Sequence, residues 1–344
     1  MTVNILKLLG IFKRPDFTGI LPSYGFQLLL ALIMSLSVSG GAIAEDALPA
    51  DHCKSISDDA NRLRCFDQAA SDPVEGSSSN TTPRVGIWGE RILKDAERDT
   101  FTLTTLKPNY IMHTYLDTPN QEPYEFLGEE GQLDNSEIKF QLNFQTKLAD
   151  NMFDDNVDLW FGYTQIAYWQ LFNDDISSPF RETNYQPEVY ISVLTNYELF
   201  GMTGRSINLG IVHQSNGRAE PLSRSWNRIT MDFIFERDNF ALAFRPWIRI
   251  EESSDSDDNP DITDFMGNYE LRGLYDLNGH LFSVMARNIF DSKHRYNAEL
   301  QWSFPINKRL RGLVQWYNGY GENMIDYNHK NNRVGFGILM TDWL

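Results

Sequence analysis

Residues 138–145 read Ile-Lys-Phe-Gln-Leu-Asn-Phe-Gln, a strict alternation of apolar and polar side chains. Successive residues of a β-strand point to opposite faces, so this stretch predicts a strand with one apolar and one polar face. The same alternation recurs in residues 157–164 and 295–304, and clusters of turn-forming residues separate such runs. The pattern predicts an all-β fold.

Extending this pattern along the chain gives about twelve candidate strands of roughly ten residues each, the length that crosses a bilayer at a tilt. They lie near residues 109–118, 136–148, 157–170, 186–198, 205–216, 225–236, 239–250, 265–276, 280–289, 294–304, 309–318 and 333–344.

Two all-β architectures compete for this pattern. A soluble sandwich would bury the apolar rows, whereas a transmembrane barrel would turn them outward and enclose the polar rows. The apolar rows end in Trp, Tyr and Phe, as an interfacial belt would. We therefore expect a twelve-stranded antiparallel transmembrane β-barrel with a short N-terminal periplasmic extension. Five charged residues are expected to fill its interior: Lys139, Glu270, Arg287, Arg295 and Glu299.

The first 44 residues resemble an export signal. A basic segment precedes the apolar residues 26–38, and Ala42-Ile43-Ala44 is typical of a cleavage site. A membrane anchor is the alternative, but the short apolar segment and the small residues after it favour cleavage. We expect a signal peptide at 1–44, an extension at 45–84 and an outer-membrane barrel domain at 85–344.

The sequence has two cysteines, Cys53 and Cys65, both just after the expected cleavage site. An even number of cysteines in an oxidising compartment suggests a structural disulfide. Residues 71–83 are rich in Ser, Thr, Pro and Gly, which is typical of a linker. The net charge of −17 argues against nucleic acid as a partner.

Three polar residues continue the apolar face of two neighbouring strands. His213 and Ser215 follow Ile211 at period two, and Asn227 begins a similar row on the next strand. An imidazole beside a hydroxyl can act as its general base, and an amide can orient the imidazole. A lone His-x-Ser occurs often by chance, but in a barrel these side chains would face lipid, so a lipid ester is the natural substrate.

Several motifs resemble those of the outer-membrane phospholipase A family. The two long ones are His213-Gln-Ser-Asn-Gly-Arg218, followed by Ser223 and Trp226-Asn-Arg228, and Ser177-Ser-Pro-Phe-Arg-Glu-Thr-Asn-Tyr-Gln-Pro187. Shorter matches are Tyr163-Thr-Gln165 and Asn259-Pro-Asp-Ile-Thr263. The resemblance covers residues 105–344. One departure is the end of the chain, because outer-membrane barrels usually end in an aromatic residue and this one ends in Leu344.

The resemblance implies a calcium-dependent enzyme that hydrolyses acyl esters of phospholipids and lysophospholipids in the outer membrane. It implies Ser215 as nucleophile, His213 as general base and Asn227 as the residue that orients His213. A calcium-bound water and the backbone N–H of Gly217 would stabilise the oxyanion. The rival interpretation is a non-enzymatic barrel or channel.

The resemblance also implies the metal ligands and a homodimer. Arg218, through its backbone carbonyl, and Ser223 would bind Ca²⁺, and Ser177 would come from the partner subunit. Gln165 lies on an outward apolar face, where an unpaired amide is costly, so it is expected at the dimer interface. Residues 251–261 form an acidic loop that either binds a further calcium ion or is simply solvated.

Overall fold

The computed structural model describes residues 85–127, 132–155, 157–307 and 310–343, together with Asp58 and Arg62. Asp58 and Arg62 belong to the unit Met1–Ser79, and the other described residues belong to the unit Asn80–Leu344. The expected signal peptide and the cysteine pair Cys53 and Cys65 lie outside the described residues.

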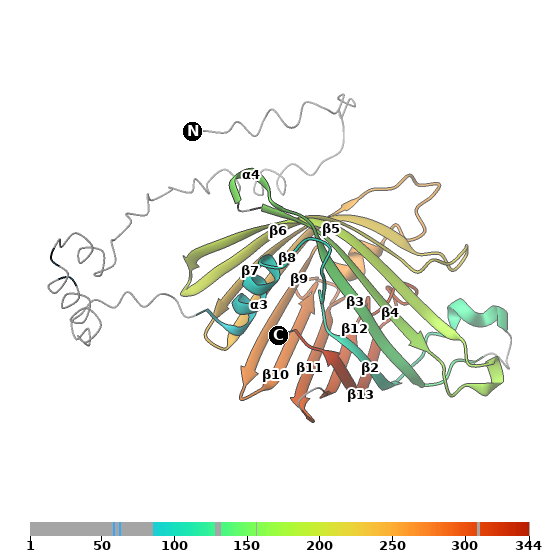
Figure 1. The fold of residues 1–344 in the computed structure, drawn as a ribbon. Coiled ribbons are helices and arrows are strands. Elements are labelled where there is room, and N and C mark those ends of the chain that lie inside the picture. The colour runs from blue at the N-terminus through green and yellow to red at the C-terminus, as the bar shows by residue number, and fades with distance from the viewer. Residues whose placement is uncertain are drawn as a thin grey trace. The chain divides into compact units, whose positions relative to one another are not determined.

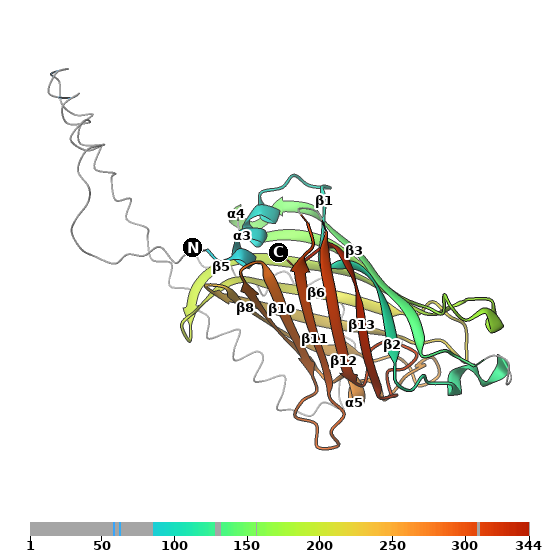
Figure 2. The same cartoon turned by 90° about the horizontal axis from the view of Figure 1, so that it is seen from below.

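Twelve strands form one antiparallel sheet that closes into a barrel, as Figures 1 and 2 show. They are β2 (Asn109–Leu116), β3 (Ser136–Asn151), β4 (Val157–Trp169), β5 (Phe180–Leu199), β6 (Met202–Ser215), β7 (Ser225–Arg237), β8 (Phe240–Ile250), β9 (Tyr269–Leu277), β10 (His280–Arg287), β11 (Asn297–Pro305), β12 (Arg311–Gly319) and β13 (Asn331–Thr341). Each strand pairs with its neighbour in sequence, and β13 pairs with β2 to close the ring. A two-residue strand, β1 (Leu103–Thr104), adds to β3.

The helical elements of the described residues are short and lie at the ends of the barrel rather than in its wall. They are α3 (Ile87–Ala96), α4 (Met152–Asp155) and α5 (Ile262–Met266), with two 3₁₀ turns, η3 (Glu122–Leu127) and η5 (Asp174–Ile176). In the part of the chain that the structure describes, no helix is both long and apolar enough to span a membrane.

The side chains of the wall alternate between the interior and the outer surface. On β2, Tyr110 and Met112 are 2% and 1% exposed, whereas Ile111 between them is 41% exposed. The outward rows are apolar: Leu142, Val189, Leu209, Ile211, Ile229, Ile248, Val284, Leu300 and Phe336 are all exposed. The polar rows point inward, so the expected barrel, with apolar rows outside and polar rows inside, is confirmed.

Three expectations from the sequence, about two strand boundaries and one interior charge, are wrong. Strand β5 begins at Phe180 rather than near residue 186, so it includes much of the long motif that starts at Ser177. Residues 265–266 belong to helix α5, and strand β9 begins only at Tyr269. Arg295 lies outside the barrel interior, in the β10–β11 connection, where it pairs with Asp264 at 2.9 Å and Asp291 at 3.2 Å.

Ion pairs and hydrogen bonds fill the barrel interior. Glu270 binds Arg287 at 2.7 Å and Arg272 at 3.2 Å, and Arg272 lies 3.5 Å from Glu299. Lys139 binds Glu322 at 3.1 Å. Buried charges are tolerated when oppositely charged partners surround them, and these pairs join β9 to β10 and β11, and β3 to the β12–β13 loop. Four of the five charges expected inside take part in this network.

The two ends of the barrel differ. At one end the connections are tight, as at Phe200–Gly201 between β5 and β6, whereas the other end has long connections, such as the eighteen residues between β8 and β9. At the tight end α3 lies beside the C-terminal Trp343 (Figures 1 and 2), and its Gly86 and Gly89 N–H groups donate to Glu236 at 2.8 and 2.7 Å. At the long-loop end an apolar cluster covers the interior: Trp226, Trp247, Ile262, Met266, Met324 and Tyr327.

Candidate functional site

His213 and Asn227 face each other across neighbouring strands near the long-loop end. They are register partners of β6 and β7, and His213 Nδ1 lies 2.8 Å from Asn227 Oδ1. An amide oxygen only accepts hydrogen bonds, so this contact places the imidazole proton on Nδ1 and leaves Nε2 as an acceptor. Both side chains are half-buried on the outer wall, beside the exposed Ile211.

Ser215 is the last residue of β6 and shares the outward face of His213. Residues two apart on a strand lie about 6.6 Å apart along the chain, so rotation of the two side chains can bring the hydroxyl to the imidazole. Among the described residues, no hydrogen bond joins Ser215 to His213. Catalytic hydrogen bonds are often open without substrate. The structure thus joins His213 to Asn227 and leaves Ser215 nearby on the same face.

The loop after Ser215 is held by a residue that the sequence analysis did not single out, Asn216. Its Oδ1 accepts from the Arg224 N–H at 3.0 Å and the Arg218 N–H at 3.3 Å, and its Nδ2 donates to Leu222 O at 2.8 Å. A buried asparagine that bonds the backbone of its own loop fixes that loop. The signal was available, since Asn is a frequent turn residue and lies inside the motif.

Gly217 has a left-handed backbone with φ of +65°, which favours glycine. An added Cβ would lie 3.1 Å from the ring of Tyr185. None of the described residues accepts a hydrogen bond from the Gly217 N–H, which therefore remains a free donor two residues after Ser215.

Arg218 binds the neighbouring strand β5 through its side chain. Its guanidinium donates to the carbonyls of Phe180, at 3.2 Å, and Arg181, and Nε lies 3.5 Å from Glu182. The Arg218 side chain is thus engaged in interactions within the protein. Of the atoms of Arg218, only the backbone carbonyl is left for a metal, because no described residue donates to it.

Ser223 lies in the same loop and donates its hydroxyl hydrogen to the Asp258 carboxylate. Asp258 belongs to the acidic loop 251–261, which the sequence analysis left without a definite role. Among residues that the structure describes, no group of three or more His, Cys, Asp or Glu side chains is arranged to hold a metal. The hydroxyl, carbonyl and carboxylate oxygens here nevertheless form a donor set of the kind that Ca²⁺ prefers.

The acidic loop makes two further contacts with this region. Asn259 Oδ1 accepts from the Ser225 N–H at 2.9 Å, and Glu252 Oε1 lies 3.1 Å from Asn227 Nδ2. Arg249 binds Asp257 at 2.6 Å and so holds the loop to the end of β8. The loop is therefore built against the site rather than merely solvated.

Gln165 lies on β4, and Ser177 lies in the connection that follows β4. Ser177 directly follows η5 with φ of +60°, and its exposed hydroxyl makes no hydrogen bond to any described residue, Arg218 and Ser223 included. Gln165 faces outward, as expected, and its oxygen accepts from the Tyr163 hydroxyl at 3.1 Å.

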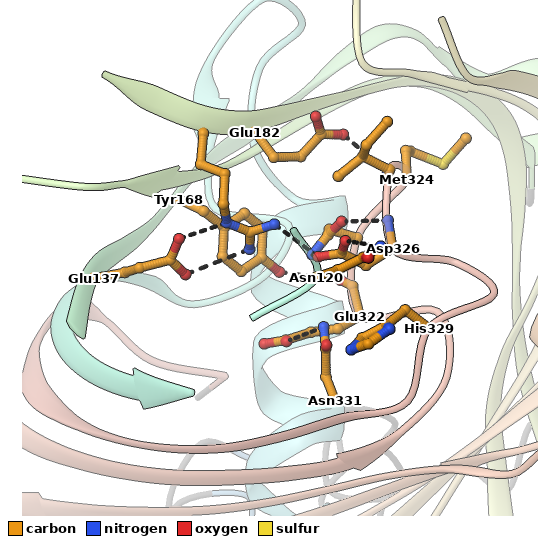
Figure 3. Close-up of polar contacts among 12 residues, drawn as sticks. Asn120, Glu137, Tyr168, Glu182, Glu322, Met324, Asp326, His329 and Asn331 are labelled. Carbon is orange, nitrogen blue, oxygen red and sulfur yellow. Dashed lines mark hydrogen bonds and ion pairs between the residues drawn. The ribbon is translucent and has the colours of Figure 1, made fainter. Parts of the chain in front are cut away.

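Beneath the site, an ion network joins β3, β5, β13 and the β12–β13 loop (Figure 3). Glu137 binds Arg181 at 2.5 Å and Arg333 at 2.8 Å, and Arg181 also binds Asp326 at 2.7 Å. Burial raises the pKa of Asp326, but the Arg181 charge and hydrogen bonds from Asn323, Arg181 and Asn120 outweigh burial and hold this pKa below its usual range. The network fixes the start of β5, whose carbonyls accept hydrogen bonds from the Arg218 side chain.

Known proteins resemble this chain over most of the barrel. The family model for phospholipase A1 matches residues 89–340. Phospholipase A1 of Klebsiella pneumoniae is 38% identical over 242 residues, which are 70% of this chain and 83% of that protein.

Two solved structures have the same fold. The calcium-bound dimer of Salmonella typhi outer membrane phospholipase has a TM-score of 0.70 and 36% identity. The match covers 75% of this chain and 100% of the Salmonella chain. An active-site mutant of Escherichia coli outer membrane phospholipase A, with an asparagine replaced by alanine, has a TM-score of 0.70 and 35% identity, with coverages of 75% and 100%. The chain therefore belongs to the phospholipase A1 family, a family of ester hydrolases built on outer-membrane β-barrels.

Proposed function

We propose that this protein hydrolyses acyl esters of phospholipids and lysophospholipids at the outer wall of the barrel, in a calcium-dependent reaction. The observation that carries the proposal is the 2.8 Å contact between His213 Nδ1 and Asn227 Oδ1 on a face that continues the apolar row ending in Ile211. This face would lie against lipid acyl chains, which brings the ester to the side chains from the membrane.

Ser215 acts as the nucleophile. His213 takes the hydroxyl proton at Nε2 while Ser215 Oγ attacks the ester carbonyl carbon, and it then gives the proton to the leaving lysophospholipid oxygen. A water, activated by the same imidazole, releases the fatty acid from the acyl-serine. Asn227 holds the imidazole with its proton on Nδ1, and the free N–H of Gly217 stabilises the oxyanion.

The Arg218 carbonyl, the Ser223 hydroxyl and the adjacent Asp258 carboxylate would hold Ca²⁺. When bound, the ion supplies positive charge close to the developing oxyanion. The relative from Salmonella typhi was solved as a dimer with bound calcium, which supports Ca²⁺ as the ion.

The active form is a homodimer in which Ser177 completes the calcium site of the neighbouring subunit. Its exposed hydroxyl is unused within its own chain, and Gln165 offers an amide nitrogen on the outward face of β4 that no described residue accepts from. Pairing of the two Gln165 amides across a two-fold axis would satisfy both. The first 44 residues act as a cleaved export signal, and the extension 45–84 lies in the periplasm.

Hydrolysis of phospholipid in mixed micelles tests the proposal. Ser215→Ala and His213→Ala should each lower kcat by about 10³-fold or more, and a chelator should abolish wild-type activity. Ser225→Ala removes a hydroxyl from the same outward face, directly across from Ser215, and should leave activity unchanged. A sulfonyl fluoride should label Ser215 in the wild type and not in His213→Ala. Normal hydrolysis by Ser215→Ala refutes the proposal.

A further inference from the structure

Glu252 forms a third link in the chain of polar groups that begins at His213. Asn227 is the register partner of Ile250, the last residue of β8, and Glu252 follows two residues later. Its Oε1 lies 3.1 Å from Asn227 Nδ2, on the side of the amide opposite His213. The side chains thus run His213, Asn227, Glu252 along the wall.

The contact determines which way the Asn227 amide faces. An amide has an oxygen and a nitrogen of nearly equal size, so a half-turn about its last bond exchanges an acceptor for a donor at the same position. If the amide turned over, its N–H₂ would face His213 Nδ1 and favour a proton on Nε2. That tautomer cannot accept the proton of Ser215.

An ionised carboxylate only accepts hydrogen bonds, so Glu252 is compatible with one orientation of the amide alone. With Nδ2 toward Glu252, the contact is a charge-assisted hydrogen bond. With the oxygen toward Glu252, two acceptors would face each other.

We propose that Glu252 is a positioning residue that keeps the Asn227 amide oxygen on His213 and so keeps Nε2 available as the base. This inference rests on the proposed serine hydrolase function. It assigns a role to the acidic loop that is separate from calcium binding, because Asp258 contacts Ser223 and Glu252 contacts Asn227.

The neighbouring residue Glu251 supplies a matched control. It carries the same charge in the same loop, is exposed, and makes no side-chain hydrogen bond or ion pair with a described residue. Glu251→Ala and Glu252→Ala therefore change the loop charge equally, and only the second removes the contact with Asn227.

Single variants of Glu252, Glu251 and Asn227, and one double variant, test the role in the full-length protein. Glu252→Ala should lower kcat about fivefold, which corresponds to about 1 kcal/mol in activation free energy, with KM and the half-activating calcium concentration unchanged. Glu252→Gln keeps an acceptor oxygen and should recover most of the activity. Glu251→Ala should match the wild type. In Asn227→Ala, the additional change Glu252→Ala should have no effect, because the residue through which Glu252 acts is gone.

Nitrogen NMR of the His213 ring gives a readout that a merely structural role would not change. The wild type should show a proton on Nδ1, and Glu252→Ala should show a mixture of the two tautomers at the same barrel stability.

The proposal is overturned if Glu252→Ala has wild-type kcat and tautomer, if its loss persists in the Asn227→Ala background, or if it acts by shifting the calcium midpoint. These results would leave the catalytic proposal intact whenever Ser215→Ala is inactive. Full activity of Ser215→Ala would instead remove the catalytic proposal itself.

Discussion

Replacing Glu137 with Gln should destabilise the barrel strongly, because Glu137 is the shared anion of two buried arginines. It accepts from Arg181 Nε at 2.5 Å, Arg333 Nη1 at 2.8 Å and Gln170 Nε2 at 2.8 Å. Its side chain and that of Arg181 are both 0% exposed. Removing one partner of a buried ion pair costs about 3–5 kcal/mol.

The lower end of this range applies here. After the substitution, Arg181 still binds Asp326 at 2.7 Å and Arg333 still binds Glu322 at 2.8 Å, so neither cation is left alone. With an m-value of about 5 kcal/mol/M in guanidinium chloride, a loss of about 3 kcal/mol lowers the unfolding midpoint by about 0.6 M.

The assay is reversible guanidinium unfolding of the barrel in lipid vesicles, followed by tryptophan fluorescence. Asp238→Asn is the control, because it removes one carboxylate from an exposed pair in the tight turn between β7 and β8, with Arg237 3.9 Å away. Exposed pairs contribute little, so the control should shift the midpoint by less than about 0.1 M. Equal midpoints for the two variants would refute the idea that the interior network stabilises the fold.

Three further predictions concern other parts of the molecule. Because the pKa of Asp326 is lowered in the folded protein, ionisation of Asp326 stabilises the fold at pH values above its ordinary pKa near 4, and this stabilisation is lost as the pH falls. Asp326→Asn should therefore lose less stability than the wild type between about pH 5 and 2, as measured by unfolding midpoints. An equal loss in the two proteins contradicts this prediction. Gly217→Ala should lower kcat about tenfold, because its φ of +65° and the Tyr185 ring force the loop to shift, and unchanged lipid hydrolysis would argue against an oxyanion role. Glu236→Gln should speed amide exchange at Gly86 and Gly89, measured by mass spectrometry, and protection equal to the wild type would show that α3 is held by other contacts.

The alternation of side chains was sufficient to predict an all-β fold, because a period of two over residues such as 138–145 fits a strand. The strand length of roughly ten residues and the aromatic ends of the apolar rows then favoured a barrel over a sandwich. The ends of strands were harder to place. Phe180 and Arg181 extend β5 because Arg181 binds Glu137 and Asp326, which are distant in sequence. No local pattern carries such a contact.

In the site, too, the local pattern predicted some contacts, and those between residues distant in sequence were not predicted. Period two placed His213 and Ser215 on one face, and register on the next strand placed Asn227 opposite His213. Asp258 and Glu252 were not predicted individually, since their contacts depend on how an eighteen-residue connection folds back on β7. Helix α3 was not predicted either, because its N-terminus is held by Glu236, 147 residues or more away.

The network around Glu137 also has a consequence for how the barrel is assembled. It joins β3, among the first strands to be synthesised, to Arg333 on the last strand and to Asp326 in the loop before it. Until β13 is in place, Glu137 and Arg181 lack these partners. A chain that stops short of β13, or that closes out of register, would hold uncompensated charge at the seam. Electrostatic pairing thus makes the completed ring, and only the correctly aligned ring, the low-energy product of insertion.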